Sequence, residues 1–142
     1  MFKIHQFSAA LFAMTAVALA PAAAYAATAG DAPAAQTLNT SPLWEDSASY
    51  IACNVVNVTT STINVQVELI SSSGSVLLGN STPISLVAGT STEVANLSNT
   101  FVGFARCRFI TNNSPDGIRA NATVFHFLGS GTYQTYATSE AR

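Results

Sequence analysis

Cys107 lies between two arginines in the stretch ARCRF, residues 105–109. Positive charge beside a cysteine lowers the pKa of its thiol and can produce a nucleophilic thiolate. The same cysteine can instead be half of a structural disulfide, with Arg106 and Arg108 facing water. The redox state of the compartment decides between these two interpretations.

The first 26 residues have the three parts of a secretory signal peptide. Lys3 and His5 give a short basic start, an apolar run follows from about residue 7 to residue 20, and AYA at 24–26 offers the small-x-small pattern of a cleavage site. The apolar run is shorter than the roughly 20 residues of a membrane span. We therefore expect cleavage after Ala26, which leaves a secreted or periplasmic protein without a stable membrane span.

Cys53 and Cys107 are the two cysteines of the chain. Cysteines of exported proteins usually pair, whereas a reactive thiolate needs a base or another group that lowers its pKa. After signal removal His126 is the one histidine left, and no lysine remains. We predict a Cys53–Cys107 disulfide, which would stabilise the fold by roughly 4 kcal/mol.

The mature chain would carry four arginines and seven acidic residues, a net charge of −3. Nucleic-acid binding depends on clustered lysine and arginine that displace counterions from the phosphates. We therefore expect no nucleic-acid partner. The 116 residues that follow the signal are close to the commonest size of a single domain.

Short alternating runs begin at Trp44. Ile63–Leu69 is the clearest, since its apolar and polar residues alternate over seven positions and predict a strand with one wet face. Tyr50–Val58 precedes it, with residues 59–62 as a hairpin connection. The phase of this earlier strand is ambiguous, and a bulge or burial on both faces would resolve it. Further strands are expected near 75–78, 84–86, 90–97, 104–111, 118–128 and 133–137.

These runs predict an all-β fold, an immunoglobulin-like antiparallel β-sandwich of about seven strands with one inter-sheet disulfide. The domain would cover residues 44–142. Residues 27–43 are small and polar, contain two prolines and show no period, so they predict a flexible lead-in.

Residues 54–94 resemble the repeat pattern of bacterial exported immunoglobulin-like modules of the adhesion-related type. Asn57 corresponds to the asparagine at a strand end, Gly74 to a tight turn, and Leu86-x-x-Gly89 to the corner before the strand at 90–94. The resemblance implies a non-catalytic accessory or interaction domain. It carries over no functional residue.

The strands at 104–111 and 118–128 are interpreted as a hairpin in which Thr111 faces Ile118. This register places Cys107 on the apolar inner face, so its neighbouring arginines point away from the sulfur. The opposite face would carry three of the four mature arginines: Arg106, Arg108 and Arg119. They form either an ordinary solvated surface or an anion-binding face for a carboxylated or phosphorylated polymer.

The residue types do not point to an enzyme. His126 lies on the apolar phase of its strand and is interpreted as a core histidine rather than a general base. Glu45 and Asp46 lack the alternating-oxygen spacing of a calcium loop, so we expect no metal and no cofactor.

Aromatic residues offer a sugar-binding alternative, with Trp44 and Tyr50, or Tyr133 and Tyr136, as the candidate pairs. The first hypothesis remains a non-enzymatic interaction or structural module at the cell envelope, with a protein or glycan partner. A glycan-binding or anionic-polymer-binding module is the alternative. A pilus-type subunit that completes itself with a neighbour's strand is the second alternative.

Overall fold

The computed structural model describes residues 34–97 and 100–142, so the expected signal peptide and the start of the lead-in lie outside the described residues. Within these ranges nothing helical has the length and apolarity needed to cross a membrane. A short 3-10 turn, η1 (Pro115–Gly117), is the one helical segment among these residues, whose other regular elements are strands. The strands are β1 (Gln36–Asn39), β2 (Leu43–Glu45), β3 (Ser49–Asn57), β4 (Ile63–Ser71), β5 (Val76–Gly79), β6 (Ile84–Leu86), β7 (Ser91–Ala95), β8 (Gly103–Thr111), β9 (Ile118–Gly129) and β10 (Thr132–Glu140).

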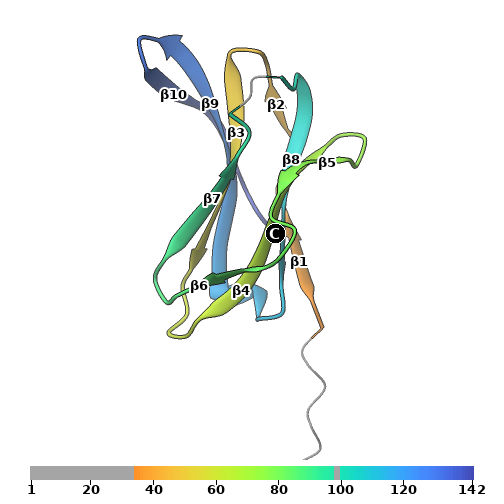
Figure 1. Cartoon of the computed structure of the whole chain (residues 1–142), viewed down its shortest axis with the longest axis vertical. Helices are drawn as coiled ribbons and strands as arrows, with labels where there is room; N and C mark the ends of the chain where they lie inside the picture. The colour runs from red at the N-terminus through yellow and green to blue at the C-terminus, as the bar shows by residue number, and fades with distance from the viewer. Residues whose placement is uncertain (1–33, 98–99) are drawn as a thin grey trace, which may run out of the picture. The chain divides into compact units, whose positions relative to one another are not determined.

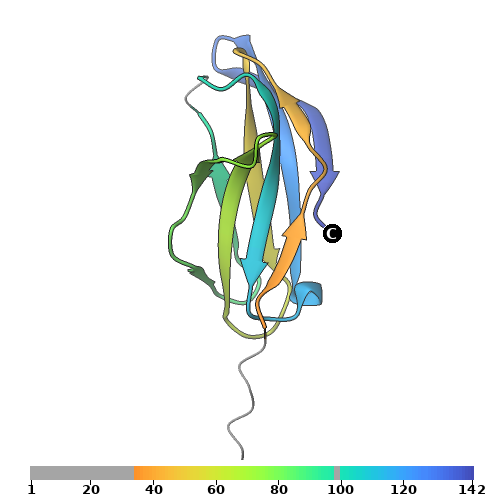
Figure 2. The same ribbon diagram turned by 90° about the vertical axis from the view of Figure 1, so that its right-hand side faces the viewer.

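The strands form two antiparallel sheets that pack against each other (Figures 1 and 2). One sheet has the order β1–β8–β4–β5, with β2 also paired to β8 and β6 to β4. The other has the order β10–β9–β3–β7. The predicted all-β sandwich is confirmed at this level, but the described residues hold ten strands rather than about seven. The additional strands are short segments at the sheet edges.

The core lies between the sheets and follows the alternation in the sequence. The apolar residues of β4 at 63, 65, 67 and 69 are buried, while Asn64 is exposed. In β3 the inner face holds Cys53 and Val55, whereas Val56 faces outward. This resolves the ambiguous phase of that strand without a bulge, since β3 pairs with β7 and β9 in continuous register. Only the inner face of β3 therefore contributes to the core between the sheets.

The predicted disulfide is confirmed. Cys53 in β3 and Cys107 in β8 are bonded, with their Cα atoms 5.5 Å apart. Because β3 and β8 belong to different sheets, the bond joins the two layers through the centre of the core.

Two expected hairpins are instead crossovers between the sheets. The connection from β3 to β4 leads from one sheet to the other, and so does the connection from β8 to β9. The five residues 58–62 reach about 16 Å when extended, which is enough to cross the roughly 10 Å between packed sheets. The predicted pairing of Thr111 with Ile118 is therefore wrong: Thr111 pairs with Val65, and Ile118 with Asn57.

The predicted flexible lead-in is also wrong over its second half, because β1 and the start of β2 pair with β8. Asn39 at the end of β1 exchanges two backbone hydrogen bonds with Arg142, at 3.0 and 3.1 Å. These bonds connect the edge of one sheet to the end of the chain that follows β10. Short edge strands without alternation are stabilised by such backbone bonds, which composition does not reveal.

Candidate functional site

The arginines of ARCRF lie on the opposite side of β8 from the cysteine. Cys107 is fully buried, while Arg106 and Arg108 project from the outer face of their sheet. Arg119 lies in β9, in the other sheet, opposite Val56. The predicted face shared by Arg106, Arg108 and Arg119 is wrong because β8 and β9 are not neighbours.

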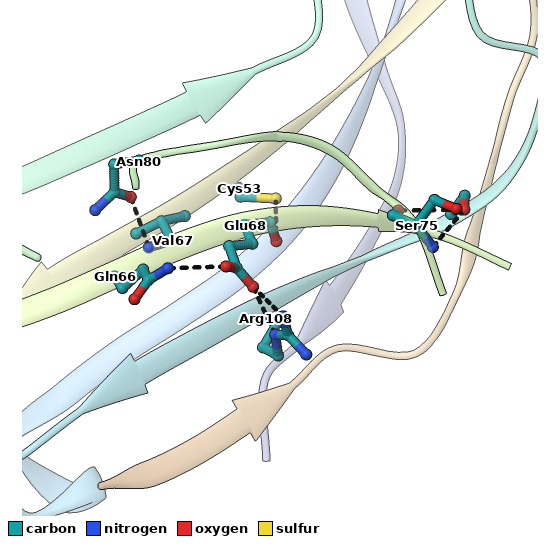
Figure 3. A network of polar contacts seen from close by, with 8 residues as sticks. Cys53, Gln66, Val67, Glu68, Ser75, Asn80 and Arg108 are labelled. Atoms are coloured by element: carbon teal, nitrogen blue, oxygen red, sulfur yellow. Dashed lines mark hydrogen bonds and ion pairs between the residues drawn. The ribbon is translucent and has the colours of Figure 1, made fainter. Parts of the chain in front are cut away.

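Arg108 already has an anionic partner within the protein (Figure 3). Its Nη2 atom lies 2.5 Å from Glu68 Oε2, and its Nε donates a hydrogen bond of 2.6 Å to the same oxygen. Gln66 donates to the other carboxylate oxygen at 2.8 Å. Glu68 is only 7% exposed. This guanidinium therefore compensates a nearly buried carboxylate instead of offering a free cation to a ligand.

Arg119 has a different setting, at the base of β9. Its Nη1 donates to the carbonyl oxygens of Asp116 and Ile118 at 3.2 and 2.9 Å. A hollow of about 590 Å³ beside it is also lined by Glu140 and Arg142. Carboxylates and arginines are mixed here, so the hollow has no single sign of charge that would select an anion.

A groove of about 390 Å³ lies between β2 and β10, with Trp44 and Tyr136 among its lining residues. Both side chains are at least half exposed. A β-bulge between Thr135 and Ala137 leaves Tyr136 without a cross-strand partner, which takes it out of the alternation of β10. The full lining consists of Trp44, Asp46, Ser49, Val124, Tyr136 and Ala137.

Polar groups stand beside these two rings. The Asp46 carboxylate accepts a hydrogen bond from the Ala48 amide at 2.9 Å. Hydrogen bonding from the Ser49 hydroxyl, and then from this amide, lowers the pKa of Asp46, so the carboxylate is ionised at neutral pH. The His126 ring lies 4.8 Å from that of Tyr136, and its Nδ1 is 3.9 Å from the Asp46 carboxylate, too far for a hydrogen bond. The groove thus combines aromatic walls with one fixed negative charge.

A second aromatic group covers the outer face of β3, β9 and β10. Tyr50 stacks on Phe125 with ring centroids 5.2 Å apart and meets Tyr133 edge-on at 5.4 Å. Phe127 lies 5.2 Å from Tyr133. Burial, followed by the nearby Glu93 and Tyr133, raises the pKa of the Tyr50 hydroxyl. None of these four rings lines the groove between β2 and β10.

The candidate sugar-binding pairs are therefore regrouped. Tyr50 lies with Tyr133, and Trp44 lies with Tyr136, rather than Trp44 with Tyr50 and Tyr133 with Tyr136. Phe125 and Phe127 were not among the predicted site residues. Their positions two residues apart, on the outward phase of β9, are the sequence signal that would have identified them.

Glu45 lies next to the groove and is fully buried. Asn96 donates to its Oε1 at 3.3 Å, while its Oε2 has no hydrogen-bond partner. Burial raises the pKa of this carboxyl group to about 7. Among the residues that the structure describes, no group of three histidine, cysteine or acidic side chains could hold a metal ion.

Comparisons with known proteins find a structure of similar fold but no matching family. No family model and no curated protein matches the chain. A solved structure described as "Crystal Structure of Thermotoga maritima 1070" is similar, with a TM-score of 0.53 and 8% sequence identity. The similarity covers 75% of this chain and 91% of that one. At this identity the likeness shows a shared all-β architecture alone.

Proposed function

We propose that the chain is an exported, non-enzymatic binding module that takes a neutral glycan in the groove between Trp44 and Tyr136. The observation that carries this proposal is the pair of exposed aromatic rings beside the ionised Asp46 carboxylate. Sugar rings present C–H groups on their faces and hydroxyl groups at their rims. An aromatic wall covers the former, and a fixed carboxylate accepts hydrogen bonds from the latter.

The charges favour a neutral ligand over an anionic polymer. Asp46 would repel an acidic sugar at the groove, and Arg108, which does not line the groove, is engaged with Glu68. His126 stands at the side of the groove, with its Nδ1 atom 3.9 Å from the Asp46 carboxylate. An anionic polymer would need several free guanidinium groups on one surface.

Two further observations support the setting in which such a module would act. The Cys53–Cys107 bond is compatible with an oxidising compartment, as expected of a secreted or periplasmic protein. A disulfide that joins two sheets of a sandwich is also a feature of immunoglobulin domains, which supports the immunoglobulin-like interpretation. The strand order differs from that of immunoglobulin domains. Here β9, which follows the second cysteine strand in the chain, pairs with the first cysteine strand β3, and β1 pairs with β8.

A glycan array probed with the mature chain, residues 27–142, tests the proposal. Neutral oligosaccharides should bind, and calorimetry with the best of them should show a loss of about tenfold or more for Trp44→Ala and for Tyr136→Ala. Asp46→Asn should weaken binding less, because it keeps one acceptor oxygen.

Tyr133→Ala is the matched control, since Tyr133 is an exposed tyrosine of the same strand that does not line the groove. It should leave the affinity unchanged. If Tyr133→Ala abolishes binding while Tyr136→Ala does not, the site lies on the outer aromatic cluster instead. If no neutral glycan binds at millimolar concentration, the proposal fails.

A further inference from the structure

The β9–β10 hairpin extends past the strand beside it. The pairing of β3 with β9 ends at Ser49 and His126, whereas β10 continues to pair with Phe127 and Gly129. The last backbone bond to a neighbouring segment is the one that the Phe127 amide donates to the Ala48 carbonyl oxygen at 2.7 Å. Beyond it β9 and β10 pair only with each other, and the hairpin stands at one end of the sandwich (Figure 1).

The projecting tip is apolar. Phe127 is 41% exposed, Leu128 58% and Tyr133 51%. The turn between them consists of Gly129, Ser130 and Gly131, all with positive φ, which keeps it tight and free of bulky side chains. Phe127 and Tyr133 cover each other in part, with ring centroids 5.2 Å apart, and Tyr133 also meets Tyr50. About half of each of these side chains, and more than half of Leu128, stays exposed because β3 ends before the tip.

Formal charge is absent from this hairpin over most of its length. No aspartate, glutamate, lysine or arginine occurs from Ala120 to Ser139, and His126 is the one titratable group of that stretch besides the tyrosines. Among the described residues, the charged group that lies near His126 is Asp46, on the turn before β3 at the base of the projection. Moving the tip into an apolar medium therefore desolvates no ion.

Amphipathic aromatic side chains stand behind the tip. Tyr136 and Trp44 are 65% and 51% exposed, and both line the groove at the base of the hairpin. Tyrosine and tryptophan prefer the boundary between water and hydrocarbon, where the ring is covered and the polar atom stays hydrated. The tip is thus apolar, and the aromatic rings behind it stand at the level of the Asp46 carboxylate, which lines the same groove. An apolar tip followed by aromatic and charged groups matches the order from the hydrocarbon to the headgroups of a bilayer.

We infer that the tip of the β9–β10 hairpin, residues 127–133, docks the protein on the surface of a zwitterionic phospholipid bilayer. Phe127 and Leu128 enter the region below the headgroups, as the apolar face of an interfacial helix does. A fluid bilayer closes around a convex projection, whereas a protein partner would need a matching pocket. Because the mature chain is acidic and the tip has no arginine or lysine, anionic lipid gives no added attraction. This inference goes beyond glycan binding and does not depend on it.

Flotation of the mature chain with phosphatidylcholine vesicles tests the inference. Binding should be measurable, should change little between about 50 mM and 500 mM salt, and should not increase when phosphatidylglycerol is added. Trp44 is the one tryptophan of the chain, so its fluorescence should shift to shorter wavelength as the vesicles bind.

Leu128→Ser should reduce vesicle binding by about tenfold, and Phe127→Ser with Leu128→Ser should abolish it. Val87→Ser is the matched control, because Val87 is 59% exposed and lies at the other end of the sandwich, where Thr90 bonds to Asn57. Each variant should keep the circular dichroism and any glycan affinity of the parent. If the double variant loses glycan affinity together with vesicle binding, it is misfolded. The vesicle binding of the single Leu128→Ser variant then decides whether the tip docks on the bilayer.

Several outcomes would overturn the inference. They are an absence of binding to phosphatidylcholine, binding that requires anionic lipid and disappears with salt, and an equal loss in Val87→Ser. Self-association that Leu128→Ser abolishes, without any vesicle binding, would instead show that the tip contacts a second copy of the chain.

Discussion

Adjacent arginines on β8 have different energetic roles. Glu68 is nearly buried and depends on Arg108 for its compensating charge, whereas Arg106 makes no ion pair with any residue that the structure describes. Arg108→Ser should therefore cost about 1–3 kcal/mol of unfolding free energy, because the carboxylate keeps only the Gln66 amide. Arg106→Ser should cost about 0.5 kcal/mol or less. Urea unfolding of both variants gives the comparison.

A second substitution checks the cause. Glu68→Gln added to Arg108→Ser should recover part of the loss, since a neutral amide needs no counter-charge. Equal costs for Arg106→Ser and Arg108→Ser would mean that the ion pair contributes nothing measurable.

The raised pKa of the Glu45 carboxyl group predicts an unusual dependence of the unfolding free energy on pH. Its pKa is raised from the ordinary value of 4.5 to about 7, so the folded state holds a proton that the unfolded state has released between these limits. The contribution of Glu45 to the unfolding free energy should therefore be fully present below pH 4.5. The unfolding free energy should fall by about 3 kcal/mol as the pH rises through about 7. Thermal unfolding from pH 4.5 to 8 measures this.

Glu45→Gln should remove the slope, because a neutral amide occupies the same site at every pH. Asp46 is not a source of the effect, since its pKa is lowered and its titration lies in acid below this window. A Glu45→Gln variant that keeps the slope of the parent would assign the dependence to another group.

At the scale of strands, alternation predicts faces better than partners. The sequence placed Cys107 inward and Arg106 and Arg108 outward, and all three assignments are confirmed. It assigned β9 to the wrong neighbour, because an alternating strand has the same inner face whether the next strand pairs with it or crosses to the other sheet. The six residues 112–117 suit either connection.

The β3–β4 crossover depends on one buried amide. Asn57 Nδ2 donates to the carbonyl oxygens of Ser61 and Leu86 at 2.8 and 2.9 Å, and Oδ1 accepts from the Thr59 amide at 2.9 Å. Asn57→Ala should cost about 2–4 kcal/mol, since these buried backbone groups lose their partner. Asn54→Ala, on the outward face of the same strand, should change stability by about 0.5 kcal/mol or less. Similar values for the two variants in urea unfolding would show that the turn does not need the amide.

At the scale of the molecule, the candidate site depends on features that the sequence hides. Trp44 and Tyr136 are 92 positions apart and line one groove because β2 pairs with β8 and because a bulge takes Tyr136 out of the alternation of β10. Neither a bulge nor an irregular edge strand has a periodic signal. The aromatic residues could be named as candidates from their types, but their grouping required the packing of both sheets.

The disulfide connects the fold of the whole molecule to its compartment. The chain expressed with its first 26 residues should be exported, begin at Ala27 and contain the Cys53–Cys107 bond, which non-reducing peptide mapping and N-terminal sequencing would detect. The chain expressed from residue 27 in a reducing cytoplasm should contain two thiols and be less stable by about 2–5 kcal/mol. Oxidation should restore the lost stability, because the bond joins two sheets that are already packed against each other. Cys53→Ala with Cys107→Ala should behave like the reduced chain in both compartments. Free thiols in the exported protein, or a retained Met1, would contradict the export prediction while leaving the sandwich itself unchanged.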